Sequence, residues 1–177
     1  QADVYMALNG GQNLLYFNTG GGKMKNVTNS NLSAGSDSTQ RVMAADVDKD
    51  GDVDLFSINT GVNRLAVSEL DNKYADVTAS HLPANMAASD SRSGQFVDLD
   101  MDGLLDIVTA TFDGQNQLLL NTGDAHFGDY TKSMPYDVDP SYVICVADFD
   151  KDGRPDLFIA NRDVNRIYLN KTPKPTK

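Results

Sequence analysis

Glutamate is nearly missing from this sequence, because the 177 residues hold 24 aspartates and a single glutamate, Glu69. An acidic surface that served only solubility, or a charged helix face, would use glutamate freely, since glutamate has the better helix propensity. Aspartate without glutamate is typical of turns and of metal-binding loops. The formal net charge of -10 argues against nucleic acid and anionic membranes as partners.

Long apolar runs and cysteine pairs are also lacking. No stretch of about 18 or more apolar residues occurs, so we expect no transmembrane helix and no insertion into a membrane. Cys145 is the single cysteine, which excludes a disulfide framework within one chain. Its place in the apolar run 142–147 predicts a small buried side chain. No basic segment opens the chain, so we expect any signal peptide to have preceded Gln1.

Residue types suited to catalysis are scarce. His81 and His126 are the two histidines, and no serine or cysteine nucleophile motif accompanies them. We expect His81 to lie in a loop and His126 at the surface. The sequence therefore predicts a protein that is not an enzyme, with no catalytic residues.

What the chain does contain is an internal repeat. Three nine-residue segments share one pattern of acids and glycine, and their starts lie 52 and 50 residues apart: DVDKDGDVD (46–54), DLDMDGLLD (98–106) and DFDKDGRPD (148–156). Each is preceded by an apolar stretch and followed by further strand-like runs. The runs lie at 13–20, 23–28, 41–45, 55–59, 63–70, 73–78, 94–97, 107–111, 116–123, 126–131, 142–147, 157–161 and 165–171.

This period predicts an all-β fold made of β-propeller blades, because four strands in about fifty residues with Gly and Asn at the turns is typical of such blades. Asp3 takes the place of Asp54 in an incomplete first unit. We expect three strands, two complete four-stranded blades and three more strands, or about half a ring, over residues 1–170. Residues 171–177 are expected to form a linker-like tail. A β-sandwich is the alternative, although it requires no fixed period.

The acidic segments have the spacing of a coordination loop, with Asp at positions 1, 3, 5 and 9 and Gly at position 6. Alternate side chains of a tight loop converge on one ion, Gly permits the sharp reversal, and the last acid closes the shell from the next strand. By analogy with other calcium loops, the backbone carbonyl at position 7 also faces the ion. The predicted ligands are Asp46, Asp48, Asp50, Asp52 and Asp54; Asp98, Asp100, Asp102, Leu104 and Asp106; and Asp148, Asp150, Asp152, Arg154 and Asp156.

A set of oxygen ligands without strict geometry favours Ca²⁺ over Mg²⁺. Zinc or copper would require His or Cys ligands, which the loops lack. We therefore expect about three Ca²⁺ per chain. An EF-hand is excluded because position 12 holds Ser57, Thr109 and Ile159 instead of a bidentate Glu, and because the flanks are strand-like. Solvated Asp-Gly turns are the remaining alternative, which three loops in one register disfavour.

In these residues the chain resembles the FG-GAP/VCBS repeat family, the β-propeller repeats of integrin α-subunits and of many bacterial secreted proteins. The resemblance rests on the DxDxDGxxD loops, each followed by an apolar strand, and covers residues 1 to about 170. It implies calcium in each loop, held by the acids at positions 1, 3, 5 and 9, and a seven-bladed ring in most members. This chain has about half of the repeats of such a ring.

Function is expected to be binding or adhesion to a protein or a glycan, with calcium stabilising each blade. The polar loops 30–40, 80–92 and 132–141 are candidate ligand surfaces, and Tyr136, Tyr142 or His81 are candidates for stacking on a ligand. The alternative is that the chain is part of a carbohydrate-active enzyme that resembles polysaccharide lyases. The resemblance implies an extracellular, cell-surface or periplasmic location. Half a propeller exposes blade faces, so we hypothesise a homodimer that completes the ring.

Overall fold

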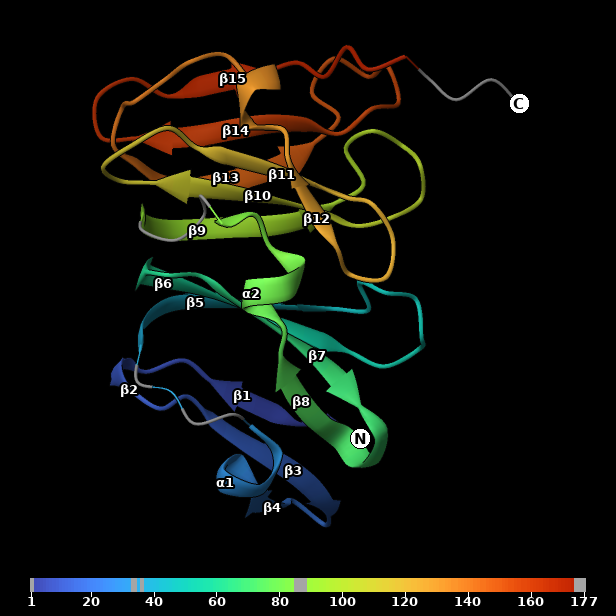
Figure 1. Ribbon diagram of the computed structural model, residues 1–177. Helices are drawn as coiled ribbons and strands as arrows, with labels where there is room; N and C mark the ends of the chain where they lie inside the picture. The colour runs from blue at the N-terminus through green and yellow to red at the C-terminus, as the bar shows by residue number, and fades with distance from the viewer. Residues whose placement is uncertain (1, 33–34, 36, 85–88, 174–177) are drawn as a thin grey trace.

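The computed structural model describes the whole chain except residues 1, 33–34, 36, 85–88 and 174–177. It is an all-β protein built from short antiparallel strands (Figure 1). The strands are β1 (Val4–Met6), β2 (Asn9–Gly11), β3 (Leu14–Gly20), β4 (Lys23–Asn26), β5 (Asp37–Ala45), β6 (Asp54–Gly61), β7 (Arg64–Glu69), β8 (Lys73–Asp76), β9 (Ser89–Val97), β10 (Asp106–Thr111), β11 (Gln117–Asn121), β12 (Phe127–Asp129), β13 (Ser141–Ala147), β14 (Asp156–Asn161) and β15 (Arg166–Tyr168).

The strands form four repeated units, which we call blades. Blade 1 is β1-β3-β4, blade 2 is β5-β6-β7-β8, blade 3 is β9-β10-β11-β12 and blade 4 is β13-β14-β15. Within each blade the strands pair antiparallel in chain order. Figure 1 shows the blades stacked one on the next, with blade 1 and blade 4 at opposite ends. The predicted open, propeller-like array of three, four, four and three strands is confirmed.

Apolar layers join blade 2 to blade 3 and blade 3 to blade 4, and backbone pairing joins blade 1 to blade 2 and blade 2 to blade 3. One core cluster lies between blades 2 and 3 and includes Phe56, Ile58, Ile107 and Leu119; a second lies between blades 3 and 4 and includes Val108, Ile144 and Ile159. The end of β6 also pairs with the start of β9, as β2 pairs with the start of β5. Blades 2, 3 and 4 therefore bury apolar residues against one another, as stacked repeats require.

The outermost strands are shorter than the sequence pattern predicts. The run 73–78 forms a strand only to Asp76, and a short helix, α2 (Thr78–His81), follows it. The strand stops because the Thr78 hydroxyl accepts a hydrogen bond from the Leu65 amide, and so replaces the backbone partner that a longer strand would provide. Thr28, at the start of α1 (Thr28–Asn31), and Thr131 accept the corresponding bonds in blades 1 and 3.

The prediction that Cys145 is buried is wrong, because its side chain is exposed. Cys145 lies on β13, on the face of blade 4 that looks away from blade 3. Its register equivalent on β5, Met43, is buried because blade 3 covers it. An apolar run therefore predicts burial only where a neighbouring blade supplies the cover. Among the described helices, none is long and apolar enough to cross a membrane.

Gly94 on β9 provides a test of the packing between blades. A Cβ at this position would lie 2.7 Å from Ile58 Cδ1 and 2.7 Å from the Val108 carbonyl oxygen. We predict that Gly94→Ala lowers the free energy of unfolding by about 1–3 kcal/mol, since overpacking of a filled core costs this much. Gly114→Ala is the matched control, because its nearest contact would be an ordinary 3.6 Å. Equal denaturant midpoints for the two variants would contradict the prediction.

Candidate metal centres and ligand face

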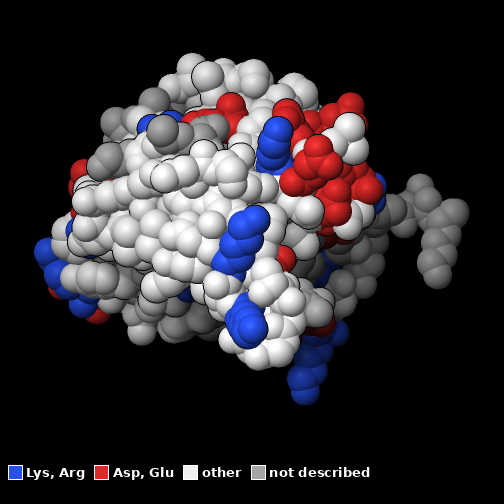
Figure 2. Space-filling view, turned by 90° about the horizontal axis from the view of Figure 1, so that it is seen from below, with Lys and Arg blue, Asp and Glu red and all other residues white. Residues whose placement is uncertain are grey.

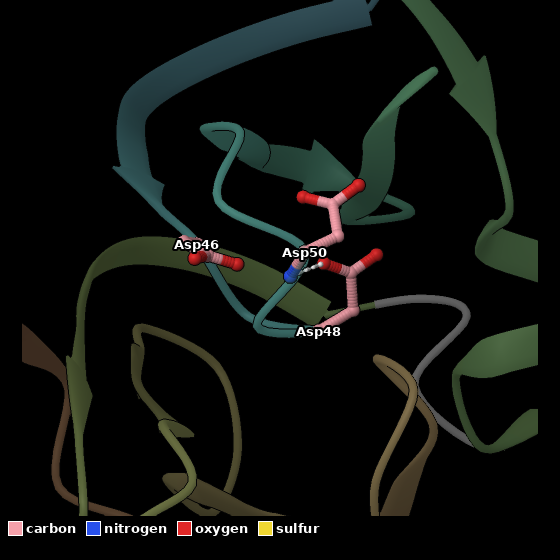
Figure 3. Close-up of side chains that lie close together, drawn as sticks. All are labelled: Asp46, Asp48 and Asp50. Atoms are coloured by element: carbon pink, nitrogen blue, oxygen red, sulfur yellow. Dashed lines mark hydrogen bonds between the residues drawn. The ribbon is translucent and has the colours of Figure 1, made fainter. Parts of the chain in front are cut away.

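Three acidic loops connect the first and second strands of blades 2, 3 and 4. In each loop, three carboxylates bring one oxygen apiece to within 4.8 Å of one another, and Figure 3 shows the first set around the loop that follows β5. The sets are Asp46, Asp48 and Asp50; Asp98, Asp100 and Asp106; and Asp148, Asp150 and Asp156. The structure thus brings together nine of the predicted ligands in three separate clusters.

Hydrogen bonds within each loop orient the carboxylates. In the second loop, Asp98 Oδ2 accepts from the Gly103 amide at 2.9 Å, Asp100 Oδ1 from the Asp102 amide, and Asp102 Oδ1 from the Leu104 amide. The same bonds occur in the first and third loops. Each of these side chains therefore uses one oxygen to accept a hydrogen bond from the loop backbone. In the first two loops, the other oxygens of the acids at positions 1, 3 and 5 make no described bond to the backbone.

The acid at position 9 has a different role. Asp106 is fully buried, and its two oxygens accept from the Leu99 amide at 2.8 Å and the Asn121 amide at 2.9 Å. Asp54 and Asp156 make the equivalent pairs of bonds. This carboxylate clamps the loop to the third strand of its own blade. Asp3 accepts the corresponding bond from the Asn18 amide in blade 1.

The loop backbone needs two left-handed residues. Gly51, Gly103 and Gly153 at position 6 have φ between 81° and 97°, as their predicted role in the reversal requires. Position 4 is also left-handed, with φ of 64° at Lys49 and 66° at Met101. The sequence does not indicate this, because Lys and Met seldom adopt that conformation without support from surrounding hydrogen bonds.

Unpaired carboxylate oxygens indicate that the first two loops are suited to a bound cation. Asp46 Oδ1 and Asp98 Oδ1 are buried and have no hydrogen-bond partner among the described residues. A buried carboxylate oxygen without a partner is costly, and a hard divalent cation with oxygen ligands removes that cost. Asp54, Asp102 and Asp152 lie in the same loops outside the three tight sets. The carbonyl ligands at Asp52, Leu104 and Arg154 stay a prediction.

The third loop differs from the other two. Both oxygens of Asp148 accept backbone hydrogen bonds, Lys171 Nζ lies 2.7 Å from Asp150 Oδ2, and Arg154 pairs with Asp152. Two cations of the protein thus neutralise carboxylates of this loop. Sequence reasoning assigned Lys171 to a linker-like tail and missed this contact, although a basic residue three positions after the last strand is a usable signal.

A groove beside blade 2 has a volume of about 540 Å³. Polar side chains of Asn63, Arg64, Asp76 and Thr78 line it together with Val62, Leu82 and Pro83. Arg64 forms ion pairs with Asp37 and Asp76. The groove lies where β6 turns into β7, and in an antiparallel meander this edge is opposite the edge that carries the acidic loops.

Parts of the three candidate ligand loops line cavities at this edge or between blades. Leu32, Gly35 and Asp37 line a small cavity beside Arg64, residues 82–84 line the large groove, and residues 133–135 line a third cavity between blades 3 and 4. Residues 33–34 and 36 of the loop 30–40, and residues 85–88 of the loop 80–92, lie outside the described residues. Tyr136 and Tyr142 are both exposed, and the Tyr142 ring packs edge-to-face on Phe112.

The two histidines meet between blades 2 and 3, which the sequence does not indicate. The rings of His81 in α2 and His126 before β12 stack with centroids 3.9 Å apart. Their Nδ1 atoms contact the Ser80 hydroxyl and the Asp124 carbonyl. Burial, and then the neighbouring His126, lower the pKa of His81.

Burial raises the pKa of Asp106 to about 6, although hydrogen bonds from Asn121 and Leu99 oppose the shift; the charges of Asp100 and Asp102 add to it. A carboxyl whose pKa is higher in the folded than in the unfolded state contributes stability at low pH, and that contribution is lost as the pH rises through the folded pKa. We predict that the thermal midpoint of the metal-free protein falls between pH 4.5 and pH 7, measured by calorimetry with a chelator.

An excess of divalent cation provides the control for this prediction. A bound cation keeps the carboxylates ionised, so the fall in midpoint across the same pH range should disappear. A metal-free midpoint that rises from pH 4.5 to pH 7 would show that Asp106 ionises without a cost in the folded protein.

Comparison with known proteins agrees with the repeated blades of the structure. The profile of the FG-GAP-like repeat matches three times, over residues 1–57, 46–109 and 98–159. Among solved structures, a lectin of Agrocybe aegerita described as specifically recognising non-reducing terminal N-acetylglucosamine is similar, with a TM-score of 0.56 and 21% sequence identity. The match covers 97% of this chain and 46% of that chain, so the present chain spans less than half of its length. No curated protein matches the sequence. Because the three profile matches tile residues 1–159, the chain belongs to the FG-GAP-like repeat family.

Proposed function

We propose that this chain is a calcium-stabilised β-propeller repeat module that binds a glycan or protein ligand outside the cell. The observation that carries the calcium part is the set of three carboxylate clusters, two of which contain a buried, unpaired oxygen. Calcium suits them because it accepts many oxygen ligands at flexible geometry, including backbone carbonyls. Asp46, Asp48, Asp50 and Asp54 would hold the first ion, and the equivalent acids the other two.

Calcium bound at one edge of the blades would hold the strands in place, and so position the residues at the opposite edge to bind a ligand. The acidic loop, the position-9 carboxylate and the third strand form one bonded unit in each blade. The groove around Arg64 lies at the other end of the same strands. Its guanidinium and the Asp76 carboxylate can bond to sugar hydroxyls or peptide groups, and Leu82 and Pro83 offer an apolar floor.

Several observations support binding rather than catalysis. The two histidines stack on each other instead of facing a pair of carboxylates across a cleft. The similar solved structure is a lectin that recognises a sugar. A secreted, cell-surface or periplasmic location is part of the proposal, because calcium-binding modules outside the cell work at high calcium concentrations.

The third loop should bind calcium more weakly than the other two, because Lys171 competes for Asp150 and Asp152. We predict that Lys171→Ala raises the calcium affinity of one site by about two- to fivefold, the range for removal of an exposed ion pair. Isothermal titration with calcium at low ionic strength measures this. Lys25→Ala on β4 is the control, since it removes the same charge far from the loops. An equal change in both variants would contradict the role of Lys171.

A glycan array and a panel of extracellular matrix proteins, each probed with calcium and with chelator, test the proposed function. We predict calcium-dependent binding that Arg64→Ala weakens at least tenfold, because the groove loses its main donor. Arg162→Ala is the matched control, since Arg162 is exposed and pairs with its neighbour Asp163. Circular dichroism checks that Arg64→Ala stays folded. Binding that survives both calcium removal and Arg64→Ala would refute the proposal.

A further inference from the structure

The first and second acidic loops lie next to each other on one side of the stack. Figure 1 shows the loop after β5 below the loop after β9, and in Figure 2 acidic side chains gather along that side of the molecule. The loops approach closely, because a Cβ added at Gly103 in the second loop would lie 3.6 Å from Lys49 Nζ in the first. These two loops also hold the buried, unpaired oxygens of Asp46 and Asp98. A residue bonded to both loops would therefore act on two candidate metal sites at once.

Asn121, the last residue of β11, is bonded to both loops through its side chain. Its Nδ2 donates to the Val47 carbonyl of the first loop at 2.8 Å and to the Leu105 carbonyl of the second loop at 3.2 Å. Its Oδ1 accepts from the Gly123 amide at 3.0 Å, and its backbone amide donates to Asp106 Oδ1 at 2.9 Å. Both hydrogens of the Nδ2 group are thus used on loop carbonyls.

The two carbonyls belong to peptide groups that carry carboxylates of the metal sites. The Val47 carbonyl is joined to the Asp48 nitrogen, and the Leu105 carbonyl to the Asp106 nitrogen. Asp48 belongs to the first tight carboxylate set and Asp106 to the second. A hydrogen bond to the carbonyl restricts the peptide group, and so restricts the position of the carboxylate that follows it. Asn121 therefore orients one predicted ligand of each site.

The hydrogen bonds of Asn121 lie in a buried region. Asn121 is 3% exposed, and Val47, which belongs to the core cluster between blades 2 and 3, is 1% exposed. Because water has little access here, a carbonyl that lost its donor would stay unpaired, which is costly. The asparagine side chain thus determines where the two peptide groups lie.

The residues equivalent to Asn121 in the neighbouring blades are bonded differently. Ser68 in blade 2 makes the same backbone bond to its position-9 acid, so a strand of this fold accepts serine at this place. Asn170 in blade 4 donates from Nδ2 to the Leu99 carbonyl of the second loop at 2.7 Å. Its own carbonyl accepts from Arg154 of the third loop, which is the loop that cations of the protein neutralise. Asn121 thus joins the two loops that have unpaired oxygens.

We propose that Asn121 is a positioning residue shared by the first and second metal sites, which makes the two sites bind calcium as a linked pair. This inference rests on the proposed calcium function. When Asp48 is fixed in a filled first site, the Val47 carbonyl, the Asn121 side chain and the Leu105 peptide are fixed with it. The second site then has less conformational freedom to lose on binding, so its affinity rises. By linkage, the effect has the same size in the other direction.

Calcium titration of the isotope-labelled chain, followed by nuclear magnetic resonance, tests the positioning role. One glycine amide reports each loop, because it donates to the first acid of that loop: Gly51, Gly103 and Gly153. Asn121→Ser should weaken calcium binding about tenfold at the first two loops, the low end of the range for partners of metal ligands, and leave the third within about twofold. Asn116→Ser is the matched control, because Asn116 is also 3% exposed in blade 3 but bonds to the backbone at the opposite edge. It should change none of the three affinities.

The linkage is tested in the same titrations with Asp100→Asn, which removes a carboxylate from the second site. This change should weaken the first site about threefold more in the otherwise unchanged chain than in the Asn121→Ser background, as a tenfold coupling between two similar sites requires. The lost charge acts alike in both backgrounds, so the difference between them isolates the linkage. Equal effects in the two backgrounds would overturn the proposal, as would an Asn121→Ser chain that loses affinity equally at all three loops or at none.

Hydrogen exchange keeps the proposal testable if Asn121→Ser does not fold. In the Asp100→Asn chain, calcium in the first loop should slow exchange of the Asn121 and Gly123 amides at least about threefold, although neither lies in that loop. The Thr111 amide at the opposite edge should be unaffected. Unchanged exchange at Asn121 and Gly123 would refute the linkage alone. Glycine amides that do not respond to calcium in the unmodified chain would instead refute the calcium sites, and the linkage with them.

Discussion

The buried carboxylate at position 9 of each acidic loop is the interaction on which the rest of a blade depends. Asp106 is fully buried, yet both of its oxygens accept backbone hydrogen bonds, one from the loop and one from the third strand. A buried charge is tolerated only when it is well bonded or neutralised, and hydrogen bonds alone leave its pKa near 6. A cation beside it would complete the compensation. The same carboxylate thus belongs to the blade's structure and to its candidate metal centre.

Position 2 of the loop extends this unit from one blade to the next. The Leu99 amide donates to Asp106 within blade 3, and the Leu99 carbonyl accepts from Asn170 of blade 4. One residue therefore joins loop, strand and neighbouring blade. The bonds that hold the loop and the bonds that hold the interface therefore meet at the same residue.

The fold was largely predictable because its signal is a repeat. Strand order, blade count and the three acidic clusters follow from a period of about fifty residues and from alternate aspartates, and the structure and the family comparison agree with the fold. Cys145 was misjudged because apolar sequence does not indicate which neighbour covers a strand. The shortened outer strands, the left-handed Lys49 and the stacked histidines were not predicted. The shortened strands and the stacked histidines result from contacts between separate segments, whereas Lys49 belongs to a turn held by hydrogen bonds within its own loop.

The sequence by itself determined the repeat, the family resemblance and the oxygen-rich chemistry of the loops, because residue type and spacing specify local backbone and ligand class. Only the tertiary structure decided that the three loops are unequal. Asp46 and Asp98 keep a buried oxygen without a partner, whereas the third loop is neutralised by Arg154 and by Lys171 from beyond the last strand. It also decided which apolar residues are covered. Burial and charge pairing depend on distances between segments, and such distances exist only after the blades have stacked.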